Sequence, residues 1–386
     1  MIITTNYKIF SIAKFILITL CLVAIITGTI YSIKAYKLGK KIHSNVKKIN
    51  LLPALEKPQF LYNADQAIRI SSVQIALEKR AKLVEYIFGS NLPSTLGDIE
   101  EITPSELTID LASLPYAHAY KMTIPLEHDF ISHTSVLLPP NYSGKAVLLH
   151  QGHSGPNSLS MDQTNEDIKT FLQKGYLVAL YQMPLCGAGP VPSSLNIDGA
   201  TIESKYFSHD TLSYLHFESG NYLKLFIEPV IVGINTLTKY FNASNVIMIG
   251  LSGGGWTTTI ASAIDPRIIT SIPVAGSYPI AFRLLPGYEN NYGDAEQRDR
   301  GMLKIAGYLD LYLLGALENN RTQLQIINKF DNCCFDGEIP LLYTPSLQRV
   351  LERLSGGTFE CFLDDSHSQH KISEQAYSRV FNAIEN

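Results

Sequence analysis

Residues 245–256 read NVIMIGLSGGGW, and they decide the fold class of this chain. An apolar run of strand character ends at Gly250, and a helix-compatible run begins near Trp256. Between them lies the only G-x-S-x-G pattern in the 386 residues, centred on Ser252. A strand that turns sharply into a helix exposes a serine hydroxyl at the edge of a sheet, and its neighbours must be small to fit. The stretch therefore predicts Ser252 as a nucleophile.

Two other interpretations of this turn explain less of the stretch. A glycine-rich turn can bury a serine that has no chemical role. A phosphate-binding loop also joins a strand to a helix, but the lysine of a P-loop and the G-x-G-x-x-G spacing are both missing. The helix after the turn would also direct its positive N-terminal dipole at negative charge that develops beside Ser252.

Short apolar runs alternate with helical patterns on both sides of this stretch. This alternation predicts an α/β fold, a mostly parallel sheet with helices on both faces. Strands are expected at 134–138, 145–151, 176–182, 245–251, 269–275, 324–330 and 358–363, and helices at 67–88, 163–173, 219–241, 255–264, 341–354 and 372–384. Residues 183–218 and 277–320 are too long for plain connections, so we expect lid insertions over the carboxyl ends of the strands. The chain thus divides into an N-terminal segment (1–48), a helical lead-in (49–130) and an α/β domain (131–386).

With these features, residues 130–386 resemble the α/β-hydrolase superfamily, in particular its esterase branch of dienelactone-hydrolase-like and acetyl-xylan-esterase-like proteins. The resemblance implies the α/β-hydrolase fold, with Ser252 in the nucleophile elbow. It also implies a catalytic triad in the chain order serine, acid, histidine. The two partners of Ser252 are therefore expected at the ends of later strands.

The acid of the triad is expected directly after the strand at 324–330. Asp331 stands at that position, and Asp336, five residues further on, is the alternative. A buried carboxylate there would orient the imidazole and stabilise its protonated form. The other reading of Asp331 is a loop aspartate that caps its own turn.

The resemblance places the histidine in the loop after the last strand, where residues 364–370 read DDSHSQH. His370 directly precedes the expected final helix, which is where similar hydrolases place their base. His367 is the alternative; with His370 as the base, it would support the site or lie on the surface. A metal site built from both histidines with Asp364 or Asp365 is disfavoured, because no third ligand group is indicated.

Two backbone N–H groups are expected to stabilise the oxyanion. Gly253, the residue after the nucleophile, supplies one. Residues 151–156 read QGHSGP and resemble the His-Gly element of esterases, so His153, supported by Gly152, supplies the other. His150 and His153 also suggest a metal, but we expect hydrogen-bonded loop histidines that line the pocket. We predict no metal and no cofactor.

Two further segments are expected near the mouth of the site. Residues 183–189 read MPLCGAG and carry no charge, which suits a loop that shapes substrate access. Residues 294–300 read DAEQRDR and are most simply interpreted as a solvated helix start, although their arginines could hold a substrate carboxylate.

The first 48 residues predict a single-pass membrane anchor. Residues 15–33 read FILITLCLVAIITGTIYSI, and this uncharged run is long enough to cross a bilayer as a helix. A cleaved signal peptide is the alternative, but its apolar region is usually shorter, and the sequence Ile33-Lys-Ala35 is not a small-x-small cleavage site. Six lysines follow the run and two precede it, which favours a cytoplasmic catalytic domain. A single span near the N-terminus can break that rule, so the side of the membrane stays open.

Charge and motifs together define the expected function. Residues 1–48 hold eight lysines and no acidic residue, which leaves 23 of the 31 basic residues against all 35 acidic ones. A domain with this excess of acidic residues is a poor candidate for binding the phosphates of a nucleic acid. We therefore predict a membrane-anchored serine hydrolase that cleaves a small acyl ester through an acyl-enzyme, with the bilayer as a partner of residues 15–33. A peptidase or acyltransferase that uses the same triad is the alternative. A hydrolase-like scaffold without catalysis is the alternative from another class.

Overall fold

The computed structural model describes residues 62–103, 114–153, 161–186, 191–283 and 293–385, with the backbone alone for residues 161–165. The expected membrane segment at residues 15–33 lies outside these ranges. Within them, no helix is both long and apolar enough to span a bilayer. The fold below is therefore that of the chain from residue 62 onward.

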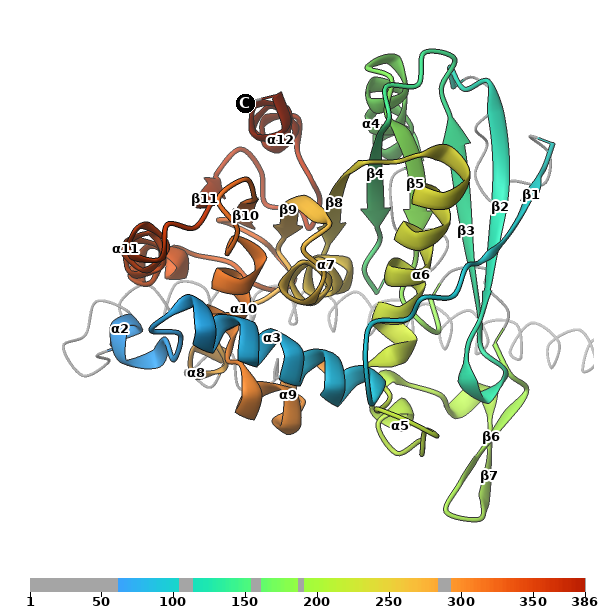
Figure 1. Ribbon diagram of the computed structural model, residues 1–386, viewed down its shortest axis with the longest axis horizontal. Coiled ribbons are helices and arrows are strands. Elements are labelled where there is room, and N and C mark those ends of the chain that lie inside the picture. The colour runs from blue at the N-terminus through green and yellow to red at the C-terminus, as the bar shows by residue number, and fades with distance from the viewer. Residues whose placement is uncertain (1–61, 104–113, 154–160, 187–190, 284–292, 386) are drawn as a thin grey trace, which may run out of the picture. The chain divides into compact units, whose positions relative to one another are not determined.

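A nine-stranded sheet runs through the described part of the chain, in the order β1-β2-β3-β5-β4-β8-β9-β10-β11 (Figure 1). Its strands are β1 (Asp98–Glu101), β2 (His118–Pro125), β3 (Ile131–Leu138), β4 (Lys145–His150), β5 (Leu177–Tyr181), β8 (Asn245–Leu251), β9 (Ile268–Val274), β10 (Thr322–Asn328) and β11 (Thr358–Asp364). The strands β1, β2, β3 and β5 pair antiparallel, whereas those from β5 to β11 in the sheet order run parallel. Parallel neighbours end at one common edge, so the loops after β4, β8, β10 and β11 meet there.

Helices cover the parallel part of the sheet. The helix that follows Ser252, α7 (Gly253–Ile264), is buried at every position and packs on β8 and β9. In Figure 1, α3 (Val73–Phe88) and α10 (Tyr308–Gly315) lie with α7 on one side of the sheet, and α12 (Glu374–Glu385) lies on the other. The remaining long helices are α4 (Met161–Gln173), α6 (Lys224–Phe241) and α11 (Thr344–Leu354). Coverage of both faces explains why the parallel strands read as continuous apolar runs.

All seven strands expected from the sequence are present, but the lead-in holds more than helices. It contributes β1 and β2 at the antiparallel end of the sheet. β1 reads DIEE and is mostly exposed, so it carries no hydrophobic run by which to recognise it. The expected helix at 67–88 is two helices, α2 (Ala64–Ala67) and α3. Ser72 separates them, because its hydroxyl accepts the Ile75 N–H at 3.2 Å and caps α3.

The two expected insertions contain short elements that meet each other. The first holds the hairpin of β6 (Ser194–Ile197) and β7 (Ala200–Glu203), followed by α5 (His209–Leu212). The second holds α8 (Ile280–Arg283), the 3-10 turn η4 (Ala295–Arg298), α9 (Arg300–Ile305) and α10. Helix α5 contacts η4, so the first and second insertions pack against each other.

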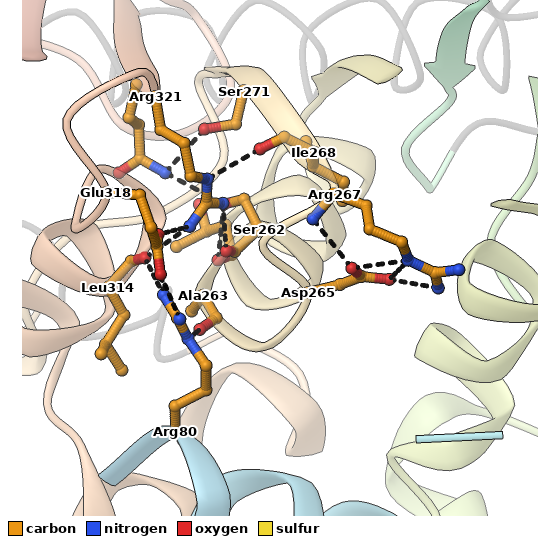
Figure 2. A network of polar contacts seen from close by, with 12 residues as sticks. Arg80, Ser262, Ala263, Asp265, Arg267, Ile268, Ser271, Leu314, Glu318 and Arg321 are labelled. Atoms are coloured by element: carbon orange, nitrogen blue, oxygen red, sulfur yellow. Dashed lines mark hydrogen bonds and ion pairs between the residues drawn. The ribbon is translucent and has the colours of Figure 1, made fainter. Parts of the chain in front are cut away.

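An arginine network fixes the C-terminal end of α7 (Figure 2). Arg80 of α3 donates to the Ala263 carbonyl at 2.9 Å, and Arg321 donates to the Ser262 carbonyl at 2.5 Å. Both guanidinium groups also bind Glu318, at 2.5 and 2.8 Å. Burial by itself would raise the pKa of the Glu318 carboxyl, but the two arginines hold it at about 2. Cations at a helix C-terminus are favoured by the helix dipole, so the network locks α7 in place.

Candidate active site

Ser252 lies at the sharp turn between β8 and α7. Its backbone angles are φ 58° and ψ −122°, which is a strained conformation for a residue with a side chain. Its N–H donates to the Val274 carbonyl of the next strand at 2.9 Å, and its carbonyl accepts the Trp256 N–H at 3.0 Å. These bonds hold the strained turn, which is the geometry of a nucleophile elbow.

Glycine at two positions makes room for this turn. A Cβ on Gly254 would lie 2.2 Å from the His150 carbonyl oxygen, so α7 could not approach β4 as it does. A Cβ on Gly152 would lie 2.6 Å from the Cβ of Ser252. The loop after β4 is therefore packed directly against the predicted nucleophile.

Asp331 and His370 are brought into contact from two different loops. The Nδ1 atom of His370 lies 2.7 Å from the Oδ2 atom of Asp331. The Asp331 side chain is fully buried, and its Oδ1 atom accepts the N–H groups of Cys333 at 2.7 Å and Cys334 at 3.3 Å. The Asn328 amide donates to Oδ2 at 3.2 Å. These donors hold the carboxylate in the position from which it orients the His370 ring.

The Nε2 atom of His370 has a lone pair that is available to accept a proton. Its Nδ1 proton is directed at Asp331, which leaves Nε2 as the basic nitrogen, and Nε2 is buried without a hydrogen-bond partner among the described residues. Burial is the largest influence on the pKa of His370 and lowers it, but the hydrogen bond and charge of Asp331 outweigh it and raise the pKa overall. The charge of His153 acts in the opposite direction, so these two histidines lie within electrostatic reach of each other.

The alternative residues are arranged differently. His367 Nδ1 accepts the Gln369 N–H at 3.1 Å, and its Nε2 faces the Oδ2 atom of buried Asp364 at 3.2 Å. Both ring nitrogens are thus engaged, and no lone pair remains to accept a proton from a nucleophile. Asp336 receives the Tyr278 hydroxyl on its backbone carbonyl at 3.0 Å. The structure brings Asp331, rather than Asp336, to His370.

The loop after β4 places its two histidines in different environments. His150, the last residue of β4, is buried, and its Nδ1 pairs with the Gln151 carbonyl at 2.8 Å. Burial lowers the pKa of His150 to about 4, so it is neutral. The His153 ring instead lies against α7: its Nδ1 and Cε1 atoms are both 2.7 Å from where a Cβ on Gly253 would stand. The two residues expected to supply the oxyanion donors are therefore in contact through the His153 ring.

A cluster that the sequence did not reveal surrounds the outer nitrogen of His153. Its Nε2 atom lies 2.9 Å from Asp294 Oδ2, 3.0 Å from His209 Nδ1 and 3.6 Å from Glu296 Oε1. His209 Nδ1 lies 3.3 Å from the same Glu296 oxygen. We call these four residues the His/carboxylate cluster. The expectation of a solvated helix start at 294–300 is wrong for Glu296, whose side chain is fully buried.

The charges in this cluster reinforce one another. Burial lowers the pKa of both imidazoles, but the carboxylates outweigh it and raise the pKa of His153 to about 9. Burial likewise opposes a charge on His209, yet the Cys186 and Glu296 hydrogen bonds raise its pKa to about 10. The histidines in turn hold the pKa of the Glu296 carboxyl below its ordinary value although burial acts against this. The cluster therefore strongly favours positive charge at its centre.

A pocket opens beside this site, at the start of the first insertion. Met183 belongs to the pocket wall, and its Cε atom lies 2.9 Å from the Cβ position of Gly253. Pro184, also in the wall, offers its carbonyl to His209 Nε2 at 2.9 Å. The wall is mostly apolar and includes Leu126, Phe130, Ile131, Leu185, Val191 and Leu225. Met183 thus connects this pocket to Gly253, whereas Ser252 and His370 do not line it.

Comparison with known proteins establishes the fold. No protein-family model and no curated protein matches the sequence. The structure is similar to acetyl xylan esterase 1 from Thermoanaerobacterium sp. JW/SL YS485, with a TM-score of 0.50 and 10% identity over 83% of this chain and 96% of that one. A family 15 glucuronoyl esterase from Caldicellulosiruptor kristjansonii aligns over 80% of this chain and 84% of its own, with a TM-score of 0.49 and 16% identity. The chain thus has the α/β-hydrolase fold, as the sequence predicted.

Proposed function

We propose that this protein is a membrane-anchored serine hydrolase that cleaves carboxylic esters with Ser252, His370 and Asp331. The observation that carries the proposal is a serine in a strained strand-to-helix turn together with a partly buried imidazole, held by Asp331, whose Nε2 has no hydrogen-bond partner among the described residues. Asp331 holds the other nitrogen of His370 at 2.7 Å, which fixes the tautomer that a general base requires.

The reaction follows from these roles. His370 Nε2 takes the hydroxyl proton of Ser252 as the oxygen attacks the ester carbonyl carbon. The N–H groups of Gly253 and His153 stabilise the oxyanion, and His370 returns the proton to the leaving alcohol. Water, deprotonated in turn by His370, then hydrolyses the acyl-enzyme and releases the acid. Asp331 remains ionised and stabilises the imidazolium at each step.

The apolar pocket indicates the part of the substrate that it would hold. Met183 links its wall to Gly253, and we propose that an acyl or alcohol group of the substrate reaches this pocket past the Met183 side chain. An ester with an apolar substituent is the substrate class that these walls favour.

Membrane attachment is the second part of the proposal. It rests on the uncharged run at residues 15–33 and its lysine flanks, with the cytoplasm as the favoured side. The full chain should stay in the membrane pellet after carbonate extraction. A protease added to sealed vesicles would reveal on which side the catalytic domain lies, and release of the protein by carbonate would contradict the anchor.

A fluorophosphonate probe tests the catalytic part directly. The detergent-solubilised full chain should be labelled on the peptide that contains Ser252, and Ser252→Ala should abolish both the labelling and the hydrolysis of p-nitrophenyl esters. Ser262→Ala, in the same helix but at its far end, is the matched control and should keep both. A folded wild-type protein that resists the probe would overturn the proposal in favour of a scaffold without catalysis.

A further inference from the structure

The His/carboxylate cluster has the composition of a metal site. Two imidazole nitrogens and two carboxylate oxygens converge from three segments: the loop after β4, α5, and the stretch that begins η4. All four atoms lie within 4.8 Å of one another. Nitrogen and oxygen ligands in this proportion suit zinc and related divalent transition ions.

The distances within the cluster match a coordination shell. Ligand bonds of about 2.0 to 2.2 Å to zinc place tetrahedral ligands roughly 3.3 to 3.6 Å apart. Four of the six separations among the ligand atoms are 2.9, 3.0, 3.3 and 3.6 Å, and all six lie within 4.8 Å. Shifts of a few tenths of an ångström would bring these four separations to tetrahedral values.

Neighbouring groups prepare His209 to bind a cation. Its Nε2 atom donates to the Pro184 carbonyl at 2.9 Å, which leaves the Nδ1 lone pair directed into the cluster. A backbone carbonyl on the outer nitrogen is the usual support for a metal-bound histidine.

The carboxylate of Glu296 is an independent indication that the cluster binds a cation. Its side chain is fully buried, and its Oε2 atom has no hydrogen-bond partner in the described part of the chain. A buried carboxylate oxygen without a partner is costly in a protein interior. A divalent ion held by this carboxylate would offset the cost of burying its charge.

Two protonated histidines would fit the geometry of the cluster less well than one divalent ion would. If both histidines were charged, His153 Nε2–H and His209 Nδ1–H would face each other across 3.0 Å. One divalent ion would replace these two protons and neutralise both carboxylates. The Asp294 side chain is 47% exposed, so the cluster has an open side through which an ion can enter.

We propose that His153 Nε2, His209 Nδ1, Asp294 and Glu296 bind one divalent transition-metal ion, with zinc as the best fit. This proposal departs from the expectation of no metal from the sequence and does not depend on the proposed hydrolase activity. The ion joins both insertions to the loop that carries His153. Because the other edge of the His153 ring lies against Gly253, the ion also sets the position of the predicted oxyanion donors.

Metal binding can be measured without any turnover. The untagged full chain in detergent, stripped with a chelator, should bind one equivalent of Zn²⁺ in a calorimetric titration. Co²⁺ should bind at the same stoichiometry with the visible absorption of a four-coordinate site, and Zn²⁺ should displace it. Absence of saturable binding by folded wild-type protein would overturn the proposal, whether or not Ser252 reacts with the probe.

Variants locate the ion. His209→Gln and Glu296→Gln should each weaken Zn²⁺ binding by at least about 10- to 100-fold, since loss of a support group alone costs that much. His216→Gln is the matched control, because His216 also pairs with a carboxylate, Asp198, at 3.0 Å, but on the surface. The same affinity in all three variants would place the ion elsewhere and refute the assignment. The Co²⁺ titration of the wild type remains decisive if a variant does not fold.

Discussion

The two ends of helix α7 lie beside two groups of buried arginine, histidine and carboxylate side chains, which differ in how completely these ionisable groups are paired. At the C-terminal end, Arg80 and Arg321 donate to helix carbonyls and share Glu318 (Figure 2). Near the N-terminal end, two buried atoms of a histidine and a carboxylate have no partner among the described residues: His370 Nε2 and Glu296 Oε2.

We infer from this difference that the groups at the C-terminal end of α7 stabilise the fold, whereas those at the N-terminal end serve binding and catalysis. A buried polar atom left unpaired costs about 1–3 kcal/mol, so a fold built only for stability would avoid such atoms. The arginine network has the arrangement expected of a clamp that holds α7 in place. The N-terminal end keeps unused lone pairs where a substrate proton or a metal ion can use them. We expect substitutions at the N-terminal end to change turnover and substitutions at the C-terminal end to change the free energy of unfolding.

The largest effect is expected at His370. His370→Ala removes the base, and kcat/KM for a p-nitrophenyl ester should fall by about 10⁴-fold or more. His367→Ala is the control and should stay within a few-fold of wild type, because both of its nitrogens are already engaged. If His367→Ala loses activity and His370→Ala keeps it, the assignment of the base is wrong.

Arg321 should have the largest effect on stability. Its side chain is 1% exposed, and Arg321→Met removes bonds to α7 and to Glu318, so the free energy of unfolding should drop by about 3–5 kcal/mol. Chemical denaturation measures this, and turnover per folded molecule should be unchanged. Arg349→Met breaks an exposed 3.0 Å pair with Asp65 and should cost less than about 1 kcal/mol. Equal losses in the two variants would contradict the clamp.

A smaller loss of turnover is expected from Gly152→Ala. The new methyl group would lie 2.6 Å from the Cβ of Ser252, so the loop and the nucleophile must move apart. A displacement of about 1 Å at such a site can reduce kcat by roughly 10²-fold. Gly307→Ala is the control, because the nearest atom to its Cβ is an arginine nitrogen at 3.5 Å. Normal kinetics in Gly152→Ala would show that the close contact plays no part in positioning.

The pH dependence should be the mildest effect. Partly buried His370 faces Asp331, Cys333 and His153, and its pKa is raised overall above its ordinary value of 6.5. Only the neutral ring accepts a proton, so kcat/KM should rise with pH to a plateau, with its midpoint above 6.5. Stability runs the other way: the contribution of protonated His370 is fully present below the unfolded pKa and is lost as pH rises through the folded one. A kcat/KM midpoint below that of free histidine would contradict this environment.

Much of this protein could be predicted from local sequence. The buried parallel strands are continuous apolar runs, and the G-x-S-x-G turn needs only its own small residues, so both were visible without the fold. The pairing of Asp331 with His370 was predicted by chain order, and the structure brings these two residues together. In contrast, β1 was missed because it is a short, polar edge strand, and β2, which lies between β1 and β3, was missed because polar residues interrupt its buried ones.

Only the tertiary structure decided what surrounds His153. Its partners lie 56 residues away in α5 and more than 140 residues away in η4 and the residue before it, and each of these segments is polar and unremarkable by itself. The sequence determined a sheet and an elbow, because these depend on patterns within a few residues, and its resemblance to α/β-hydrolases predicted the chain order of the triad candidates. Burial of Glu296 and the convergence of two imidazoles depend on how two insertions fold onto one loop, and local patterns carry no record of such long-range packing.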